Sequence, residues 1–305
     1  MAFHPQHFGL YFSREHVEVA RQHREDPPFE AAWKMLHERA QTGVQHAQWG
    51  AIHYRFDDDI IEGEGALKQL MTCARGGFDP DMTFIDALNE LLVEAHAFEM
   101  LRDHPAMDAA TEAEFLGLFE QHFAYLTTLD TEHSYVEALV LTLLKFVAGV
   151  VLEREALLQQ AIDVYERVIR EDIHPQGHIP KAVGAKDGGG LLRQLLTVAV
   201  LVLMAEASSL VGFNLWDYSF RGVSLMTAFS YLLYYYYYPD KWRWDPNVTA
   251  EPFREYGGFL EIVNRRAYPK DLKPLLDDLR PVYDAPGGGL TTLSHGVARK
   301  RGGFK

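Results

Sequence analysis

The sequence has little cysteine and no excess of basic residues, and each shortage excludes a class of protein. The single cysteine, Cys73, excludes an internal disulfide and any metal site built from several cysteines, and it suits cytoplasm and periplasm equally. The 29 lysines and arginines are outnumbered by 43 aspartates and glutamates, so the formal net charge is -14 at pH 7. This charge argues against nucleic acid or an anionic membrane surface as the main partner. An anionic ligand would need a local basic pocket.

Long hydrophobic runs and leader-like segments are also scarce. The longest charge-free apolar stretches, residues 195–205 and 138–144, are shorter than the roughly 20 residues that cross a bilayer. The opening MAFHPQHFGLYF lacks the basic-then-apolar pattern of a signal peptide. The sequence therefore predicts a soluble protein with no membrane partner, cytoplasmic as it stands, or periplasmic or secreted if a signal was removed.

Hydrophobic residues make up 48% of the chain and recur with helical spacing. Segments 88–101, 115–126 and 158–169 each place their apolar residues on one face, which predicts amphipathic, outward-facing helices. Segments 138–152 and 191–205 are apolar nearly all round and need cover on every side. This alternation predicts an all-α fold with inner and outer helices in a single domain, an α/α toroid, with a helical bundle as the alternative. We find no strand hairpin in the pattern.

Two breaks and a tail interrupt the helical pattern. Residues 174–190 hold five glycines and two prolines, and residues 239–252 form a similar irregular connection, of the kind that carries function on rigid scaffolds. The chain from Asp284 is rich in glycine and ends in basic residues without apolar periodicity. We therefore expect a folded domain over residues 1–283 and a frayed tail over residues 284–305.

An unbroken run of five tyrosines, residues 234–238, lies between these breaks. Gly222 and Ser224 begin a helix here, and Pro239 ends it. The helical stripe predicts that Tyr236 faces the interior, and we expect Tyr234 to be buried as well.

The order of motifs around these breaks resembles the latter half of the alginate-lyase-like polysaccharide lyases. Members of that family place an Asp-Gly-x-x-Pro turn before a long helix, then Gly-x-Asp-Leu-Trp/Tyr-x-Tyr, a Gly-x-Ser-Leu helix and Pro-x-x-Trp. The matching stretches here are QGHIP (176–180), GFNLWDY (212–218), GVSL (222–225) and PDKW (239–242). The opening HPQHFGLYFSREHVEVARQH is similar to the start of the same family's domain.

The resemblance implies an α/α toroid that cleaves a uronic-acid polymer, such as alginate or glucuronan, by β-elimination. This chemistry needs a group that neutralises the sugar carboxylate, a base for the C5 proton and an acid for the leaving O4 oxygen. In the family these come from an Asn-His pair, an arginine and a tyrosine soon after the Pro turn. It implies no metal or organic cofactor.

Carried over by position, the family pattern is only partly kept. Glu132 and His133 lie where the Asn-His pair is expected, so the histidine is kept and glutamate replaces asparagine. The tyrosine position falls on Arg193, and the preceding basic position falls on Lys186 or Ala185. The expected catalytic residues are His133 as the base or carboxylate-side partner, Arg193 as a carboxylate-binding cation and Tyr135 as the acid. The expected substrate-binding residues are Glu132, Lys186, His178, Trp216, Tyr218, Trp242 and Trp244.

Two alternatives remain open at this point. Because the asparagine and tyrosine are replaced, the chain could be an inactive lyase-like fold that binds a saccharide or a protein. Asp58, Asp59 and Glu62 also spell the DDxxE pattern with which all-α terpene synthases hold magnesium. That reading predicts Asp58 and Asp59 at the mouth of an apolar pocket.

Overall fold

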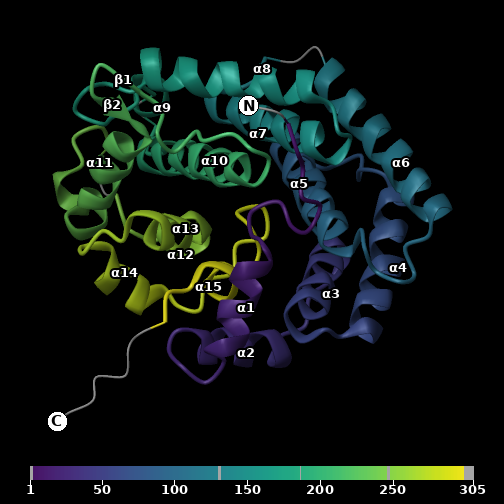
Figure 1. The fold of residues 1–305 in the computed structure, drawn as a ribbon. Helices are drawn as coiled ribbons and strands as arrows, with labels where there is room; N and C mark the ends of the chain where they lie inside the picture. Colours follow the sequence, from purple (N-terminus) through teal and green to yellow (C-terminus); the bar gives the residue numbers. More distant parts are fainter. Residues whose placement is uncertain (1–2, 130–131, 186, 246–247, 299–305) are drawn as a thin grey trace, which may run out of the picture.

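The computed structural model describes residues 3–129, 132–185, 187–245 and 248–298. The long helices alternate in chain order between an inner and an outer position (Figure 1). The elements are α1 (Arg14–Gln22), α2 (Phe29–Glu38), α3 (Gly43–Asp57), α4 (Ile60–Gly76), α5 (Phe84–Leu101), α6 (Ala109–Thr128), α7 (Tyr135–Val151), α8 (Glu155–Arg167), the π-helix η1 (Val168–Asp172), α9 (Pro180–Val183), α10 (Gly190–Leu210), β1 (Ser219–Phe220), β2 (Val223–Ser224), α11 (Leu225–Tyr237), the 3-10 helix η2 (Pro239–Lys241), α12 (Pro252–Glu255), α13 (Gly258–Ala267), α14 (Leu272–Leu279) and α15 (Thr291–His295).

The inner helices form a closed circle. Successive contacts run α3–α5–α7–α10–α13–α15–α1 and return from α1 to α3 (Figure 1). Outside them, α4 packs on α3, α6 on α5, α8 on α7, α11 on α10, α14 on α13 and α2 on α15. The chain is therefore a single-domain α/α toroid, as the alternation of fully apolar and amphipathic segments predicts.

Two of the inner helices, α7 and α10, are covered on nearly every side. Helices α7 and α10 bury most of their length, as their apolar composition predicts, and amphipathic α8 lies outside them. Among the helices that the structure describes, α10 is long and apolar enough to cross a bilayer. However, 78% of its most apolar stretch is buried inside the protein, as an inner helix requires.

Helix α5 differs from its expected outward-facing position. Every residue from Leu91 to Leu101 is buried, and the helix lies in the inner ring between α3 and α7. The sequence misleads here because polar residues interrupt the apolar stripe. Three of them, Glu94, His96 and Glu99, are themselves buried.

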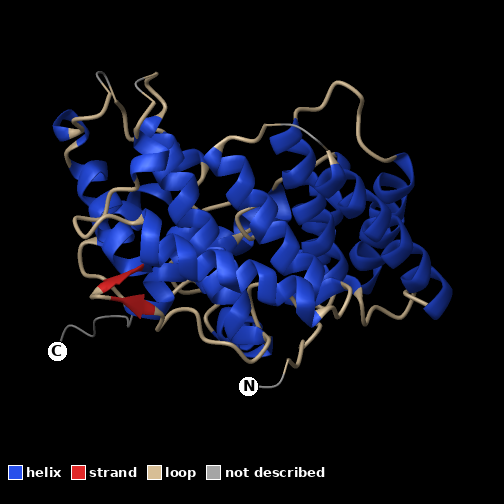
Figure 2. Cartoon of the chain, turned by 90° about the horizontal axis from the view of Figure 1, so that it is seen from above, coloured by secondary structure: helices blue, strands red, loops and turns tan. Residues whose placement is uncertain are grey.

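A β-hairpin with strands of two residues each is the second difference from the sequence prediction, which included no strand. Strands β1 and β2 pair antiparallel through Phe220 and Val223, at one edge of the molecule (Figure 2). Both turn residues have positive φ, 51° at Arg221 and 80° at Gly222, which is the conformation of a type I′ hairpin turn. Strands this short leave no alternating pattern.

The expectation that the chain frays from Asp284 is wrong for residues 284–298. Asp284 and Gly289 exchange backbone hydrogen bonds of 3.0 and 2.8 Å, and α15 follows with all five residues buried. The His295 ring bonds to the carbonyl of Tyr11 at 3.0 Å, which attaches this segment to the start of the chain. Residues 284–298 therefore belong to the folded domain, because they supply the inner element that closes the ring.

The five tyrosines divide between core and surface along α11. Tyr235 is buried at 8% exposure, and Tyr236 packs half-buried against Phe253. Tyr234 is 47% exposed, so its expected burial is wrong. The helix begins one residue after Ser224 and ends at Tyr237 before Pro239, as predicted. The consecutive tyrosines thus point in different directions around the last turn of α11, some into the core and some to the surface.

We expect Tyr235→Ala to lower the free energy of unfolding by about 3 kcal/mol, because it leaves a cavity beside Trp242. Tyr234→Ala, one residue away, should change it by less than about 0.5 kcal/mol, as exposed positions do. Urea denaturation of the two variants and the wild type measures both values. Equal losses in the two variants would contradict this division of the tyrosine run.

Candidate functional site

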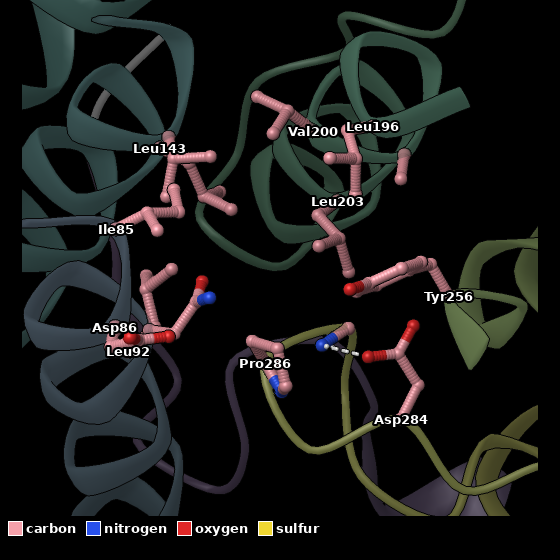
Figure 3. A pocket seen from close by; sticks show the side chains of 14 residues that line it. Ile85, Asp86, Leu92, Leu143, Leu196, Val200, Leu203, Tyr256, Asp284 and Pro286 are labelled. Atoms are coloured by element: carbon pink, nitrogen blue, oxygen red, sulfur yellow. Dashed lines mark hydrogen bonds between the residues drawn. The ribbon is translucent and has the colours of Figure 1, made fainter. Parts of the chain in front are cut away.

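A cavity of about 230 Å³ lies among the inner helices of the ring. Its walls are the N-terminal part of α5, the middle of α7, the middle of α10, and the chain around Tyr256 and Asp284 (Figure 3). Most of the lining is apolar. The lining residues are Ile85, Asp86, Asn89, Leu92, Val140, Leu143, Leu196, Ala199, Val200, Leu203, Tyr256, Asp284, Pro286 and Gly287.

Asp284 is the buried carboxylate of this cavity. It accepts hydrogen bonds from the backbone amide of Gly258, at 3.1 Å, and from that of Gly287, at 3.0 Å. Figure 3 shows the second of these bonds as a dashed line. A side chain at Gly287 would lie 2.1 Å from the Asp284 carboxylate, so the close approach of this amide requires glycine. Burial raises the pKa of the Asp284 carboxyl to about 6, against the lowering effect of the two amides.

Tyr256 supplies the phenol of the cavity. Its hydroxyl points into the space between α5 and α10 (Figure 3). Burial, followed by a side-chain hydrogen bond with Glu255 and by the charges of Glu255, Asp284 and Asp86, raises the pKa of Tyr256 to about 12. The phenol is therefore protonated near neutral pH and can donate a proton or a hydrogen bond to a ligand. Among the described lining residues, none carries a positive charge.

His133 lies just before the first turn of α7, at the end of the ring where α5 also begins. Its ring stacks on Phe84 with centroids 4.1 Å apart and planes 11° apart. The Ser134 hydroxyl caps α7 by accepting from the amide of Glu137 at 3.3 Å, and this cap fixes the chain next to His133. Phe84 faces a separate surface pocket between α5 and α6, and Ile85, which follows it, lines the central cavity. Glu132 is exposed.

Tyr135 points away from the central cavity towards a buried carboxylate. Its hydroxyl donates to Asp172 at 3.0 Å, and Asp172 also pairs with Lys181 at 2.8 Å and Arg167 at 3.3 Å. Burial, followed by the charge of Asp172, raises the pKa of Tyr135. Lys181, which directly follows the proline of the QGHIP stretch, is thus held by Asp172.

Arg193 holds the glycine-rich loop before α10. Its guanidinium donates to the carbonyls of Ala182, at 2.7 Å, and Ala185, at 3.0 Å, and to both carboxylate oxygens of Asp187 at 2.8 Å. These bonds hold the pKa of Asp187 well below its usual range. The guanidinium fork is therefore bound within its own loop. Lys186 lies outside the described residues.

The predicted aromatic residues divide into two groups. His178, Trp242 and Trp244 pack with Tyr231 and Tyr235 of α11, and the His178 ring lies 5.1 Å from Trp244. In the other group, the Trp216 indole donates to Glu206 at 3.1 Å, and Tyr218 lies in the turn that leads to β1. Of the predicted site residues that the structure describes, none lines the central cavity.

Asp58 and Asp59 serve the local structure of α3 and α4. Asp59 caps α4 by accepting from the amides of Ile61 and Glu62, each at 3.0 Å. Asp58 pairs with Arg21 at 2.6 Å. Capping and ion pairing thus account for the DDxxE pattern, and these residues do not lie at the mouth of the apolar central cavity.

Comparison with known proteins agrees with this architecture. The family model described as Alginate lyase matches residues 82–242, which is more than half of the 305-residue chain. This chain belongs to the alginate lyase family. At the family level, the match and the fold support a polysaccharide lyase, and they leave the magnesium-dependent terpene alternative without support. No curated protein matches the chain.

Several solved structures of alginate lyases share the fold. One is alginate lyase A1-III from Sphingomonas species A1, with a TM-score of 0.70, 15% identity, and coverage of 88% of this chain and 78% of that chain. A variant of the same lyase complexed with a tetrasaccharide gives a TM-score of 0.72 at 16% identity, over 90% of this chain and 80% of that chain. An alginate lyase from Bacteroides ovatus gives 0.75 at 11% identity, over 94% and 98%.

The family match also shows what the sequence motifs leave out. It spans α5, α7 and α10, which form most of the cavity wall, and ends before Tyr256 and Asp284. Sequence reasoning missed both residues because they lie in or next to segments without periodicity. The signal that could have found Asp284 is DAPGGG, an acidic residue followed by a proline and three glycines, because clustered glycines permit a tight turn around a carboxylate.

The raised pKa of Asp284 predicts a pH dependence of stability. Its pKa is 3.8 when unperturbed and about 6 in the folded chain, so the folded state binds the proton more tightly. This stabilisation is complete below pH about 4 and is lost as the pH rises through about 6. Between pH 4 and pH 7, we expect the free energy of unfolding of the wild type to fall by about 2 kcal/mol relative to Asp284→Asn. Urea denaturation at both pH values measures this difference. Parallel pH profiles for the two proteins would contradict the assignment.

Proposed function

We propose that this member of the alginate lyase family cleaves a uronic-acid polymer, of the alginate or glucuronan type, by β-elimination at the central cavity. The observation that carries the proposal is a phenol, Tyr256, that points into the cavity of the family's fold. Its pKa of about 12 keeps it protonated, as the acid for the leaving O4 oxygen must be. This assignment replaces Tyr135 as the acid, because Tyr256 lines the cavity, whereas Tyr135 does not line it and donates its hydroxyl to Asp172.

His133 is the proposed base for the C5 proton. It lies just before α7, whose middle part forms a cavity wall, and His133 itself is outside the cavity lining. It is next to a helix N-terminus, where free backbone amides favour an anionic group. The Glu137–Ser134 capping box and the stack on Phe84 hold the chain at this position. Asp284 would orient the sugar by accepting a hydrogen bond from a hydroxyl group.

The mutational test compares three variants. His133→Ala and Tyr256→Phe should each lower kcat on the cleaved polymer by at least about a hundredfold, which is the lower range for general acid or base catalysis. Tyr135→Phe should lose much less, because its hydroxyl already serves Asp172. The assay follows the ultraviolet absorbance of the unsaturated uronate on alginate, glucuronan and glycosaminoglycans. If Tyr135→Phe is inactive and Tyr256→Phe is not, the acid is Tyr135. No product on any of these polymers would exclude the proposed activity.

A second candidate function is saccharide binding without cleavage. The favouring observation is the charge of the site, since the described cavity lining offers the carboxylates of Asp86 and Asp284 and no cation for a substrate carboxylate. The cations that the sequence places nearby, Arg193 and Lys181, are bound to Asp187 and Asp172. A neutral or partly apolar saccharide would meet neither a repulsive charge nor an unpaired cation.

Calorimetric titration separates the two candidates. A non-catalytic binder should take up a neutral oligosaccharide more tightly than a uronate oligosaccharide and release no unsaturated product from either. Tyr256→Phe should then weaken binding by about tenfold, the value of one hydrogen bond to a ligand. Tighter binding of the uronate with product formation would instead support the lyase.

A further inference from the structure

Two histidines and an aspartate meet on the outside of the ring, where α2 connects to α3. His37 lies in the last turn of α2, and His53 and Asp57 lie one turn apart on one face of α3. One ligand atom from each lies within 4.8 Å of the others. All three line a surface pocket of about 640 Å³ that is separate from the central cavity.

The hydrogen bonds of the two imidazoles fix their tautomers. His37 Nδ1 lies 2.7 Å from the carbonyl oxygen of Trp33, and His53 Nε2 lies 3.0 Å from the carbonyl oxygen of Leu36. A carbonyl oxygen only accepts, so these two nitrogens carry the protons. In each neutral ring the other nitrogen, His37 Nε2 or His53 Nδ1, then has a free lone pair.

Both lone pairs face the same carboxylate oxygen. Asp57 Oδ2 is 2.8 Å from His37 Nε2 and 3.7 Å from His53 Nδ1. Three electron-pair donors that converge in this way repel one another unless a proton or a cation lies between them. Imidazole that donates its second N–H to a backbone carbonyl is the usual outer-shell arrangement of a metal-binding histidine.

The geometry points to a divalent transition-metal ion held by His37, His53 and Asp57, and zinc is the ion that suits this donor set. Zinc bonds of about 2.0–2.1 Å in a tetrahedron place neighbouring ligand atoms about 3.3 Å apart, which lies between the two observed separations. The Arg24 guanidinium donates to the other oxygen, Oδ1, at 3.0 Å and leaves Oδ2 for the ion. The His37 side chain is 44% exposed, so the fourth position is open to water.

A second His/Glu cluster, His16, Glu206 and His295, does not share these features. The amide of Ser13 donates to His16 Nδ1 at 3.2 Å, so the proton of that neutral ring sits on Nε2. His295 Nε2 donates to the carbonyl of Tyr11 at 3.0 Å, and Glu206 accepts from the Trp216 indole. These three residues are held by their own hydrogen bonds, and we assign no ion to them.

An ion at the first cluster would join the end of α2 to the end of α3. Helix α2 packs against α15, the element that closes the ring, and α3 is an inner helix. A metal that binds the folded chain and not the unfolded chain stabilises the fold by mass action. The site therefore supports the closure of the ring rather than the chemistry of the central cavity.

The test uses the full chain without a polyhistidine tag, stripped of metal by a chelator. We expect one Co²⁺ per chain in a visible-absorption titration, with the intense bands of four-coordinate cobalt, and one Zn²⁺ per chain by calorimetry. His37→Gln and His53→Gln should each weaken binding by at least about tenfold. The matched control is His23→Gln, which removes another His–Asp pair, with Asp26 at 3.0 Å, and should bind like the wild type.

Two results would overturn the assignment. One is the absence of saturable Co²⁺ and Zn²⁺ binding in the wild type, which would leave a protonated His37–Asp57 ion pair as the explanation of the 2.8 Å contact. The other is equal affinity in His37→Gln and His23→Gln. Circular dichroism shows whether each variant is folded. If His53→Gln unfolds, the metal affinity of His37→Gln alone tests the site, because His37 is exposed and its replacement should leave the fold intact. Loss of polysaccharide cleavage plays no part in either result.

Discussion

Closure of the ring is the constraint on which the rest of this structure depends. Helices α5, α7 and α10 are buried along most of their length, so each must have an inner neighbour on both flanks as well as an outer cover. A row of such helices with free ends would expose the flanks of its first and last members. The chain meets this requirement by bringing α15 against α1, with the His295 ring bonded to the Tyr11 carbonyl.

The same closure places two polar side chains of the cavity, those of Asp284 and Tyr256. The segment that returns the chain from α14 to α15 must cross the interior of the ring, and Asp284 lies at its turn. Two backbone amides hold the carboxylate, and the glycines around it allow the approach. Tyr256 precedes α13, the neighbouring inner helix, and reaches the same space. Both polar residues therefore lie beyond residues 82–242, the part of the chain that the family model matches.

The sequence predicts the ring of helices but not the polar residues that line its cavity, Tyr256 and Asp284. Full apolar composition in α7 and α10, with an amphipathic helix between them, determines the order of inner and outer positions. Helix α5 is mispredicted because its two buried glutamates and its buried histidine give the pattern of an exposed face. Arg193 and Lys181 look like ligand-binding cations until the structure shows Asp187 and Asp172 beside them. Partner choice among charged groups is a property of the folded chain, and a sequence window does not contain it.

The most direct measurement of the central claim is ¹⁹F NMR of the chain labelled with 3-fluorotyrosine and titrated with oligosaccharides. Spectra of the Tyr256→Phe and Tyr135→Phe variants assign the two resonances. The account predicts a saturable shift of the Tyr256 resonance and little change at Tyr135, because the Tyr135 hydroxyl is bonded to Asp172 outside the cavity. A saturable shift at Tyr135 with an unchanged Tyr256 resonance would contradict the assignment of the site to the central cavity.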